Sequence, residues 1–336
     1  MDIGVIGGGS WGTALAKLLA DNGHDVMVWV HDGELVDPMN EQHENPIYMP
    51  DITLPSTLRA TNDIGAATRG RDMILSVSPS HVLRSVLEQI VDELPEGVPI
   101  VSATKGIEND SLMLVSDIFE DVLPPKFHPF LCYLSGPSFA REVALEKPTA
   151  VTIASHNHRL AVDMQRLFSN EYFRCYTSND VIGVEIGGAL KNVIAIASGA
   201  VSGMELGLNA SAGMITRGLH EITKIAVKKG ANPLTLTGLA GMGDLVLTCT
   251  GGLSRNRTVG TKLGQGMSID EILDEMMEVA EGVKTSKSVY DLSRQMDVEM
   301  PISEQVYKVL YEDKSPEQAV TDLMSRELKP EMGGWM

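Results

Sequence analysis

The chain has 336 residues, more than one hydrophobic core usually serves, so we expect two domains. Hydrophobic residues make up 43% and charged residues 21%, the balance of a soluble globular protein. The formal net charge of −18 argues against a nucleic-acid-binding surface, which would be basic. An anionic small molecule is compatible with this charge, provided that its site gathers local cations and backbone N–H groups.

The cysteines and the N-terminus indicate in which cellular compartment the protein is found. Cys132, Cys175 and Cys249 are an odd number, lie far apart and lack the paired spacing of a metal site. We therefore expect no metal at these thiols, and a reducing, cytoplasmic location rather than a disulfide framework. Asp2 follows Met1 and no basic segment precedes the first apolar run, so no secretion signal is expected.

The first half of the chain alternates strand patterns with helical ones. Residues 3–6 form a short apolar run, residues 6–12 read IGGGSWG, and an apolar helical period follows. A second apolar run at 25–30, DVMVWV, completes a βαβ unit.

Five more strands are predicted downstream, with helices between them near 80–92, 110–121 and 157–169. The strands are expected at 72–78, 99–104, 130–136, 149–155 and 173–178. Apolar strands that alternate with helices form parallel, doubly wound sheets. This half of the chain therefore predicts a Rossmann-like α/β fold.

The pattern changes near residues 180–188, where long helical periods begin and strand candidates nearly vanish. Helices are expected at 181–201 and 212–230. We place a Rossmann-like dinucleotide-binding domain at 1–183 and an all-helical domain at 184–336.

The stretch 181–201 has nearly the length of a membrane-spanning helix. Glu185, Lys191 and Asn192 lie near its middle, and such groups are costly in lipid. We therefore expect a buried central helix of a soluble domain and no membrane span.

Gly7, Gly9 and Gly12 match the G-x-G-x-x-G pattern between a strand and a helix. In that setting the first glycine permits a tight turn, the second admits a pyrophosphate, and the third lets the helix pack on the strand. Ser10 and Trp11 lie on the turn and would flank a cofactor. The plainer alternative is a structural turn with Trp11 in the core.

The residue that usually holds the NAD ribose is an acidic one about 20 positions downstream. Here His31 occupies that position, followed by Asp32. A histidine could face the 2′-phosphate of NADP, and Asp32 could still reach a ribose. The sequence leaves both cofactors open and favours NADP(H).

Two motifs follow predicted strands, at the edge that borders the ligand crevice in open α/β sheets. Lys105 lies in ATKGIE, and Gly136 and Ser138 lie in SGPSFA. A solvated lysine and a helix cap are the plainer interpretations. Alternatively, the lysine, the hydroxyl and the turn N–H groups line the crevice.

Lys191 interrupts an otherwise apolar helical stretch, which is costly unless its amine is used. Burial lowers the pKa of a lysine, which suits a general base. Asp244 follows a glycine pair, where it could hold Lys191. Glu185 lies nearly on the face of Asn192, and a structural buried ion pair is the alternative to catalysis.

The turn SRNR at 254–257 offers a second cationic feature in the helical half. Arg255 supplies a charged fork and Asn256 an amide, a combination that suits a phosphate or pyrophosphate. Such a turn is often only solvated. The glycine-rich approach, TGGLSRNR, favours a binding loop.

Together these motifs resemble those of the bacterial-type NAD(P)-dependent glycerol-3-phosphate dehydrogenases. The resemblance runs from IGVIGGGSWGTALA to EMPISEQVYKVLY, nearly the whole chain, with the motifs in the same order. They are GGGSWGTALA, ATKGIE, SGPSFARE, GGALKNVIAI, AGMGDLVLTCT, SRNR and AEGV.

The resemblance implies an enzyme that interconverts dihydroxyacetone phosphate and sn-glycerol 3-phosphate with NADP(H) and/or NAD(H), with Lys191 as the catalytic proton acceptor and donor. The implied substrate-binding residues are Lys105, Gly136, Ser138, Lys191, Asp244, Ser254, Arg255 and Asn256. Besides the three glycines, the implied cofactor-binding residues are Ser10, Trp11, His31, Tyr48, Lys105, Ala140, Arg255, Val279 and Glu281. Asn192 and Thr248 match supporting polar positions.

The resemblance also implies a homodimer, dimerised through the helical domain, that supplies the glycerol phosphate of phospholipids. A nicotinamide site, a buried amine and a phosphate-binding turn agree with this, because together they suit hydride transfer on a phosphorylated alcohol.

Three alternatives remain at this point. Another lysine-dependent hydroxyacid dehydrogenase would place an asparagine four residues after the lysine, where this chain has Ala195. A nucleotide-sugar dehydrogenase would need a catalytic cysteine, and Cys249 has no matching base. A non-catalytic NADP(H) sensor would have no use for Lys191, Asp244 and Arg255 together.

Overall fold

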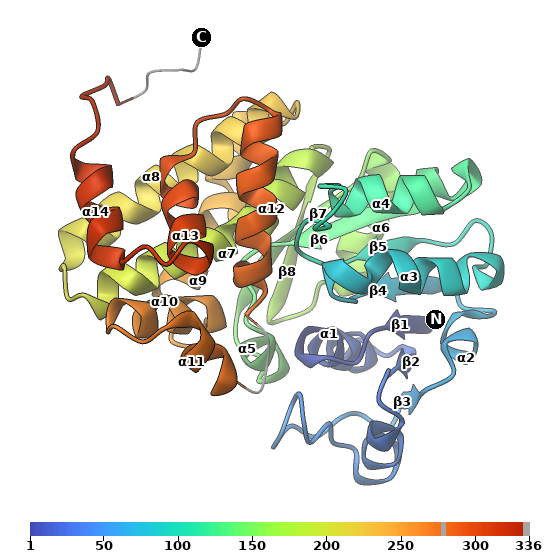
Figure 1. Ribbon diagram of the computed structural model, residues 1–336. Helices are drawn as coiled ribbons and strands as arrows, with labels where there is room; N and C mark the ends of the chain where they lie inside the picture. The colour runs from blue at the N-terminus through green and yellow to red at the C-terminus, as the bar shows by residue number, and fades with distance from the viewer. Residues whose placement is uncertain (277–279, 332–336) are drawn as a thin grey trace. The chain divides into compact units, whose positions relative to one another are not determined.

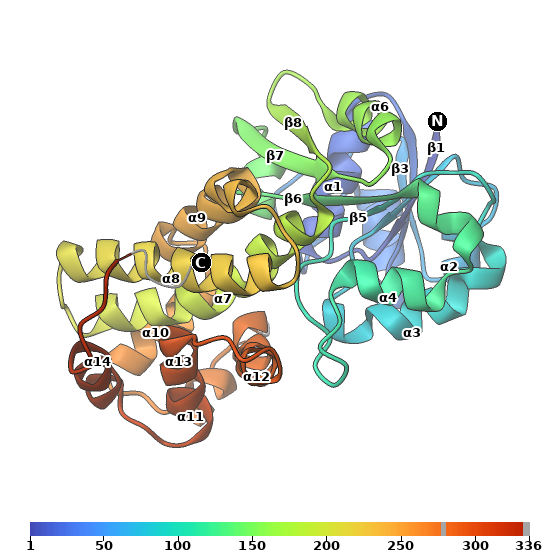
Figure 2. The same ribbon diagram turned by 90° about the horizontal axis from the view of Figure 1, so that it is seen from above.

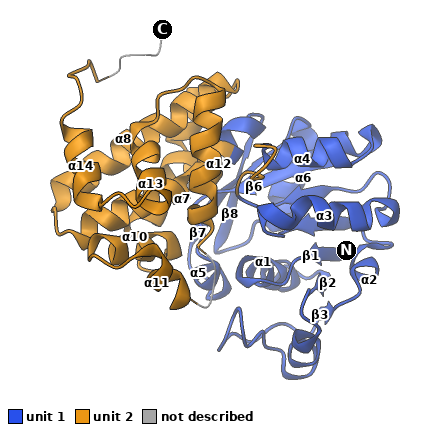
Figure 3. Cartoon of the chain, in the orientation of Figure 1, with its two compact units in different colours: residues 1–105, 113–185 blue, residues 106–112, 186–336 orange. Residues whose placement is uncertain are grey.

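The computed structural model describes residues 1–276 and 280–331, which fold into two compact units (Figure 3). Residues 1–105 and 113–185 form the first, here the sheet unit. Residues 106–112 and those from 186 onward form the second, the helical unit. The short segment 106–112 therefore belongs to the helical unit although sheet-unit residues flank it in the chain.

The sheet unit contains one eight-stranded sheet, in the order β3-β2-β1-β4-β5-β6-β7-β8. The strands are β1 (Asp2–Ile6), β2 (Asp25–Trp29), β3 (Leu58–Thr61), β4 (Met73–Ser76), β5 (Ile100–Ser102), β6 (Leu131–Ser135), β7 (Thr149–Ala154) and β8 (Phe173–Ser178). In the central strand β1, Val5 pairs with Val28 on one side and Leu75 on the other, and none of the three side chains is exposed. The apolar runs of the sequence are therefore the buried centre of the sheet.

Six helices accompany this sheet. They are α1 (Ser10–Asp21), α2 (Ile64–Thr68), α3 (Ser80–Ile90), α4 (Val115–Val122), α5 (Ala140–Ala144) and α6 (His158–Phe168). Helices α2, α3 and α4 lie on one face and α1, α5 and α6 on the other (Figure 1; Figure 2). The doubly wound architecture predicted from the alternating pattern is confirmed.

The sequence-based expectation of a fully parallel sheet is wrong at one place. β7 pairs antiparallel with β6 and parallel with β8, and the other neighbouring pairs are parallel. The connection from β6 to β7 contains only the five-residue helix α5. Such a helix spans about 7.5 Å, which is too short to return the chain along a five-residue strand of about 17 Å. The chain therefore turns back beside β6.

The helical unit contains the remaining helices of the described residues. They are α7 (Val181–Gly203), which starts in the sheet unit, α8 (Leu208–Lys228), α9 (Asp244–Thr250), α10 (Arg255–Gly264), α11 (Ile269–Asp274), α12 (Glu281–Gln295), α13 (Pro301–Tyr311) and α14 (Pro316–Met324). Helix α7 is long and apolar enough to cross a membrane by length and composition. However, 83% of its most apolar window is buried inside the protein. It is the core helix that the sequence predicts.

Helices α7 and α10 approach each other so closely that glycine is required on both. A Cβ atom at any of four positions would overlap a carbonyl oxygen of the facing helix. The four positions are Gly199 and Gly203 on α7, and Gly260 and Gly264 on α10. The backbones of α7 and α10 are therefore in direct contact at these four positions.

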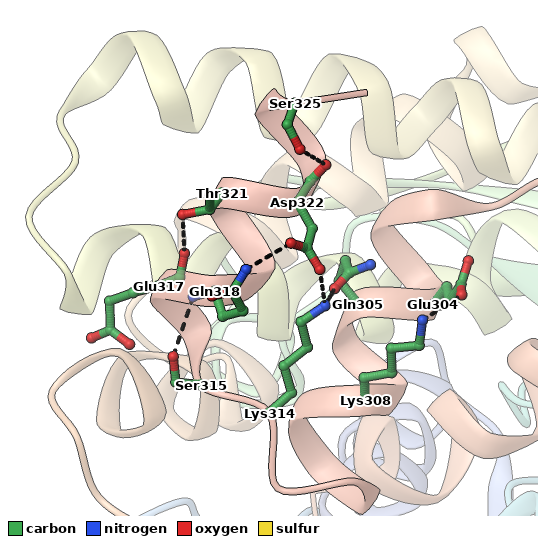
Figure 4. Close-up of polar contacts among 10 residues, drawn as sticks. All are labelled: Glu304, Gln305, Lys308, Lys314, Ser315, Glu317, Gln318, Thr321, Asp322 and Ser325. Carbon is green, nitrogen blue, oxygen red and sulfur yellow. Dashed lines mark hydrogen bonds and ion pairs between the residues drawn. The ribbon is translucent and has the colours of Figure 1, made fainter. Parts of the chain in front are cut away.

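The last two helices are joined by polar contacts (Figure 4). Lys314, between α13 and α14, contacts Gln305 of α13 and Asp322 of α14. Ser315 caps α14, accepting a hydrogen bond from the Gln318 N–H at 3.2 Å. The Lys314 side chain is 16% exposed, and its contacts tie α14 to α13.

Two buried glutamates cap the N-termini of other helices. Glu185, on α7, accepts a hydrogen bond from the Ser116 N–H at 2.8 Å and another from the Ser116 hydroxyl, at the start of α4. Glu221, on α8, accepts from the N–H groups of Ile302 at 2.6 Å and Ser303 at 3.1 Å, at the start of α13. Carboxylates at these positions satisfy donors that a helix start leaves unpaired.

Burial nevertheless makes the charged form of these carboxyl groups costly. It raises the pKa of Glu185 to about 8 and that of Glu221 to about 7, against the lowering effect of the hydrogen bonds. In the unfolded chain the ordinary value is 4.5. The native state therefore binds the proton of Glu221 more tightly than the unfolded chain does. This contribution to the free energy of unfolding is fully present below about pH 4.5 and is lost as the pH rises through 7.

We expect the Glu221→Gln variant to lack this pH dependence. Between pH 5.5 and 8.5, the free energy of unfolding of the wild type should fall by about 2 kcal/mol relative to the variant. Urea unfolding of both proteins at the two pH values measures the difference, and every other titrating group cancels in it. Parallel pH profiles for the two proteins would contradict this origin of the pH dependence.

Candidate active site

The turn between β1 and α1 has the geometry that the glycine pattern predicts. Gly7 has φ +122°, which favours glycine, and its N–H donates to the Trp29 carbonyl of β2 at 3.2 Å. A Cβ at Gly12 would overlap the Gly7 carbonyl oxygen, so only glycine lets α1 pack this close to the turn. A Cβ at Gly9 would meet nothing within 4 Å. The turn therefore packs tightly against α1 at Gly12 and leaves open space beside Gly9.

This opening lies at the N-terminus of α1. The N-cap residue Gly9 provides no side-chain cap, and Ser10 begins the helix. Among the described residues, the buried Trp11 Nε1 has no hydrogen-bond partner. A helix start with N–H donors, beside an open glycine, fits the phosphates of a dinucleotide. These residues therefore fit the cofactor that the sequence predicts.

Asn45 supports the turn from a distant part of the chain. Its side chain is fully buried, and Nδ2 donates to the Gly8 carbonyl at 3.0 Å and to Thr13 Oγ1 at 2.9 Å. Its Oδ1 accepts from the Tyr48 N–H at 3.1 Å, which ties Tyr48 to the same network. Asn45 is not among the residues predicted from the sequence, because no local pattern marks a residue 37 positions from its partner.

His31 follows β2 at the carboxyl edge of the sheet and is exposed, as is Asp32. The rings of His31 and Trp29 are arranged edge to face, with their centroids 6.0 Å apart. The Asp32 carboxylate accepts from the Glu34 N–H at 3.0 Å and so caps a short 3₁₀ turn. Both side chains lie where the sequence expects the cofactor ribose.

Three predicted substrate residues meet in the sheet unit. Lys105 Nζ and Ser138 Oγ both donate to the Gly136 carbonyl oxygen, each at 3.0 Å. Gly136 has φ +145°, and a Cβ there would meet Val151 Cα at 2.9 Å. Ala140 begins α5 directly after this turn. The turn thus places an ammonium group and a hydroxyl together.

Lys191 and Asp244 form a buried ion pair in the helical unit. Lys191 Nζ, on α7, contacts Asp244 Oδ1 at the start of α9. The two residues are 9% and 0% exposed. Thr248 Oγ1 donates to the Asp244 carbonyl oxygen at 2.6 Å. Low-dielectric surroundings and a buried carboxylate fix the position of the ammonium group of Lys191.

The SRNR turn begins α10 of the same unit. Ser254 caps the helix, its hydroxyl accepting from the Arg257 N–H at 3.2 Å. Arg255 and Asn256 are the first two helical residues, and Asn256 is 8% exposed. Asn256 Oδ1 accepts from the Gly282 N–H of α12 at 2.8 Å.

Two predicted cofactor residues lie next to that contact in sequence. Glu281 is the first residue of α12. Val279 lies outside the described residues. The helical unit thus brings Lys191 together with Asp244, and Asn256 together with the start of α12.

Glu185, which the sequence places nearly on the face of Asn192, contacts Ser116 at the start of α4. It caps α4. The sequence could not show this, because helical periodicity indicates which face a residue occupies but not what lies opposite that face.

The three cysteines are buried, and burial raises the pKa of each thiol to about 12. A thiolate nucleophile is therefore not available at neutral pH. Within residues 1–276 and 280–331, no three His, Cys, Asp or Glu side chains group as metal ligands.

Comparisons with known proteins identify the family of the chain. Residues 2–161 match the family described as NAD-dependent glycerol-3-phosphate dehydrogenase N-terminus, and residues 180–321 match its C-terminus. The chain is 55% identical over 331 residues to a glycerol-3-phosphate dehydrogenase [NAD(P)+] of Leptospira biflexa, with 98% of this chain and 99% of that protein covered. It is 56% identical over 331 residues to the protein of the same name from Geobacter metallireducens, with the same coverage.

A solved structure extends the comparison to the fold. The crystal structure of glycerol-3-phosphate dehydrogenase from Coxiella burnetii matches with a TM-score of 0.91 at 39% identity, covering 97% of this chain and 99% of that one. Its likeness includes the mixed eight-stranded sheet followed by helices. The chain belongs to the NAD-dependent glycerol-3-phosphate dehydrogenase family and is an oxidoreductase that uses NAD(P).

Proposed function

We propose that Lys191 is the group that moves the proton in the dehydrogenase reaction, at the C2 oxygen of the substrate. The buried Lys191–Asp244 pair carries this proposal. When bound, the nicotinamide cofactor supplies or accepts the hydride. Lys191 Nζ gives its proton to the C2 oxygen as dihydroxyacetone phosphate is reduced, and takes it back in the oxidation of sn-glycerol 3-phosphate.

Asp244 holds Lys191 in place for this transfer. Its carboxylate is fully buried, and it contacts Nζ directly. After the ammonium has given up its proton, the neutral amine remains within hydrogen-bonding reach of the same carboxylate. The amine therefore keeps its orientation until it is protonated again, which is the preorganisation that catalysis requires.

The substrate phosphate requires local cations in a chain of net charge −18. We assign substrate binding to two groups of residues that also match the family motifs. They are Lys105, Gly136 and Ser138 of the sheet unit, and Lys191, Asp244, Ser254, Arg255 and Asn256 of the helical unit. The shared acceptor of Lys105 and Ser138 supports the first group, and the capped SRNR turn supports the second.

We assign cofactor binding to the glycine turn and the residues around it. The open space beside Gly9 and the buried Trp11 Nε1 support this assignment. The full set is Gly7, Gly9, Ser10, Trp11, Gly12, His31, Tyr48, Lys105, Ala140, Arg255, Val279 and Glu281. The exposed imidazole of His31 supports a preference for NADP(H), because it can face a 2′-phosphate.

The roles of the two domains, the cellular location, the metabolic role and the homodimer follow from the same resemblance. We place the dinucleotide-binding domain at 1–183 and a substrate-binding, dimerising domain at 184–336. The enzyme acts in the cytoplasm and supplies glycerol phosphate to phospholipid synthesis. Sedimentation equilibrium tests the homodimer: a monomer at micromolar concentration would contradict it.

Absorbance at 340 nm tests the activity. The purified protein should oxidise NADPH or NADH when dihydroxyacetone phosphate is added, and should form one sn-glycerol 3-phosphate for each cofactor oxidised. Comparing kcat/KM for the two cofactors measures the preference assigned to His31. A protein that turns over neither cofactor would overturn the proposed reaction.

A further inference from the structure

The start of α12 is capped from a distant part of the helical unit. The N-cap residue, Ala280, has no side chain that can accept a hydrogen bond. The Gly282 N–H, one of the donors that a helix start leaves unpaired, instead donates to Asn256 Oδ1 at 2.8 Å. This bond is buried, and it joins residues 26 positions apart.

Gly282 also lies against the helix that carries Lys191. A Cβ on Gly282 would meet Asn256 Oδ1 at 2.6 Å and the backbone oxygen of Asn192 at 2.9 Å. Distances under 3.0 Å are closer than real Cβ contacts, and the Asn192 carbonyl belongs to the backbone of α7. Only glycine therefore lets the first turn of α12 reach both Asn256 and α7.

The hydrogen bond fixes which way the amide of Asn256 faces. The Gly282 N–H can only donate, so the atom that it contacts must be the oxygen of the amide. The planar amide then directs Nδ2, with its two N–H donors, away from Gly282. Neighbouring contacts hold the helix start in place, since Tyr311 Oη and Ser286 Oγ both donate to the Val283 carbonyl at 2.7 Å.

We propose that Gly282 is a positioning residue for substrate binding: its N–H holds the Asn256 amide so that Nδ2 faces the phosphate of the substrate. The proposal rests on the proposed function, in which Asn256 binds substrate. It adds a residue that touches no ligand itself and acts through Asn256. It also gives Asn256 two roles, as the cap of α12 and as a donor to the phosphate.

Asn256→Asp separates these two roles. An aspartate keeps an oxygen that can cap α12, and replaces the donor Nδ2 by a negative oxygen that repels phosphate. We expect the thermal midpoint to stay at the wild-type value, and KM for dihydroxyacetone phosphate to rise by about 100-fold or more. Asn256→Ala loses both roles, so its midpoint should fall as well. An Asn256→Asp enzyme with wild-type KM would overturn the orientation proposed for the amide.

A double-mutant cycle tests whether Gly282 acts through Asn256. Gly282→Ala should raise KM for dihydroxyacetone phosphate by about 10-fold or more, with kcat changed by less than about 3-fold. In Gly282→Ala/Asn256→Ala, KM should match that of Asn256→Ala within about 3-fold, because the orienting contact is already absent. Additive effects, or a wild-type KM in Gly282→Ala, would overturn the role of Gly282.

Controls distinguish this inference from the proposed function. Lys284→Ala, at an exposed position two residues further along α12, should leave KM unchanged. A wild type without turnover would defeat the proposed reaction itself. An active wild type with an unaffected Asn256→Ala would defeat only the substrate role of Asn256. If Gly282→Ala does not fold, the Asn256→Asp comparison still decides the orientation.

Discussion

Replacing Lys191 with methionine should lower kcat by about 10²- to 10⁴-fold, the range that a positioned proton donor contributes. Methionine keeps the length of the side chain and removes the proton that the reaction needs. Progress curves at 340 nm, at saturating cofactor and substrate, measure the loss. A kcat close to that of the wild type would contradict the role of Lys191.

The same substitution should also destabilise the protein, because Asp244 would keep a buried charge without its partner. Breaking a buried pair in this way costs about 3–5 kcal/mol. Adding Asp244→Asn should therefore restore much of the stability but none of the turnover. Lys262→Met, which removes an exposed pair with Glu275, should change neither quantity appreciably. Urea unfolding of the wild type and the three variants separates the catalytic effect from the structural one.

Alanine at Gly9 and alanine at Gly12 should have different effects, although both alter the same turn. At Gly9 the backbone has φ −70° and the new Cβ meets nothing within 4 Å, so the protein should fold with a cost of about 1 kcal/mol or less. The methyl group would occupy the space into which a pyrophosphate must come, so affinity for NAD(P)H should fall by roughly 100-fold.

At Gly12 the new Cβ would overlap the Gly7 carbonyl oxygen, so α1 must move away from the turn. We expect a loss of stability of about 3 kcal/mol together with the loss of cofactor binding. Fluorescence titration with NADPH and urea unfolding measure the two quantities. Equal effects of the two variants on stability, or unchanged affinity in Gly9→Ala, would contradict the geometry described for the turn.

The elements that the sequence predicts well are those with strong local patterns. The glycine turn and the apolar strand at 25–30 identify the βαβ unit, because a period of 2 or 3.6 and a turn signal lie within one short window. The strand β3, Leu58–Thr61, was missed. It is a four-residue strand at the edge of the sheet, and only Leu58 and Ala60 of its four residues are apolar, too few to give a strand pattern. The direction of β7 was also missed, since an apolar run carries no information about direction.

Within the candidate site, the sequence singles out charged residues in unusual places better than it indicates which residues contact them. Lys191 stands out because it interrupts an apolar helix, and the pairing with Asp244 was expected from its position after two glycines. Asn45 and Gly282 were missed as supporting residues. Both form hydrogen bonds with residues 26 or more positions away, and only the fold brings these partners together.

The close contact between α7 and α10 limits how this enzyme could acquire new substrates. Lys191, the proposed proton donor, lies on α7, and the SRNR turn, proposed to bind the substrate phosphate, begins α10. The contact of the two backbones therefore constrains the distance between these two parts of the helical unit. Side chains lining a pocket can be exchanged singly, but this distance changes only if a whole helix moves. If the proposed roles hold, a longer phosphorylated alcohol would require this distance to change, and a side chain at any of the four glycines would overlap the facing backbone. The distance between these two parts of the proposed site is therefore set by the packing of two backbones rather than by exchangeable side chains.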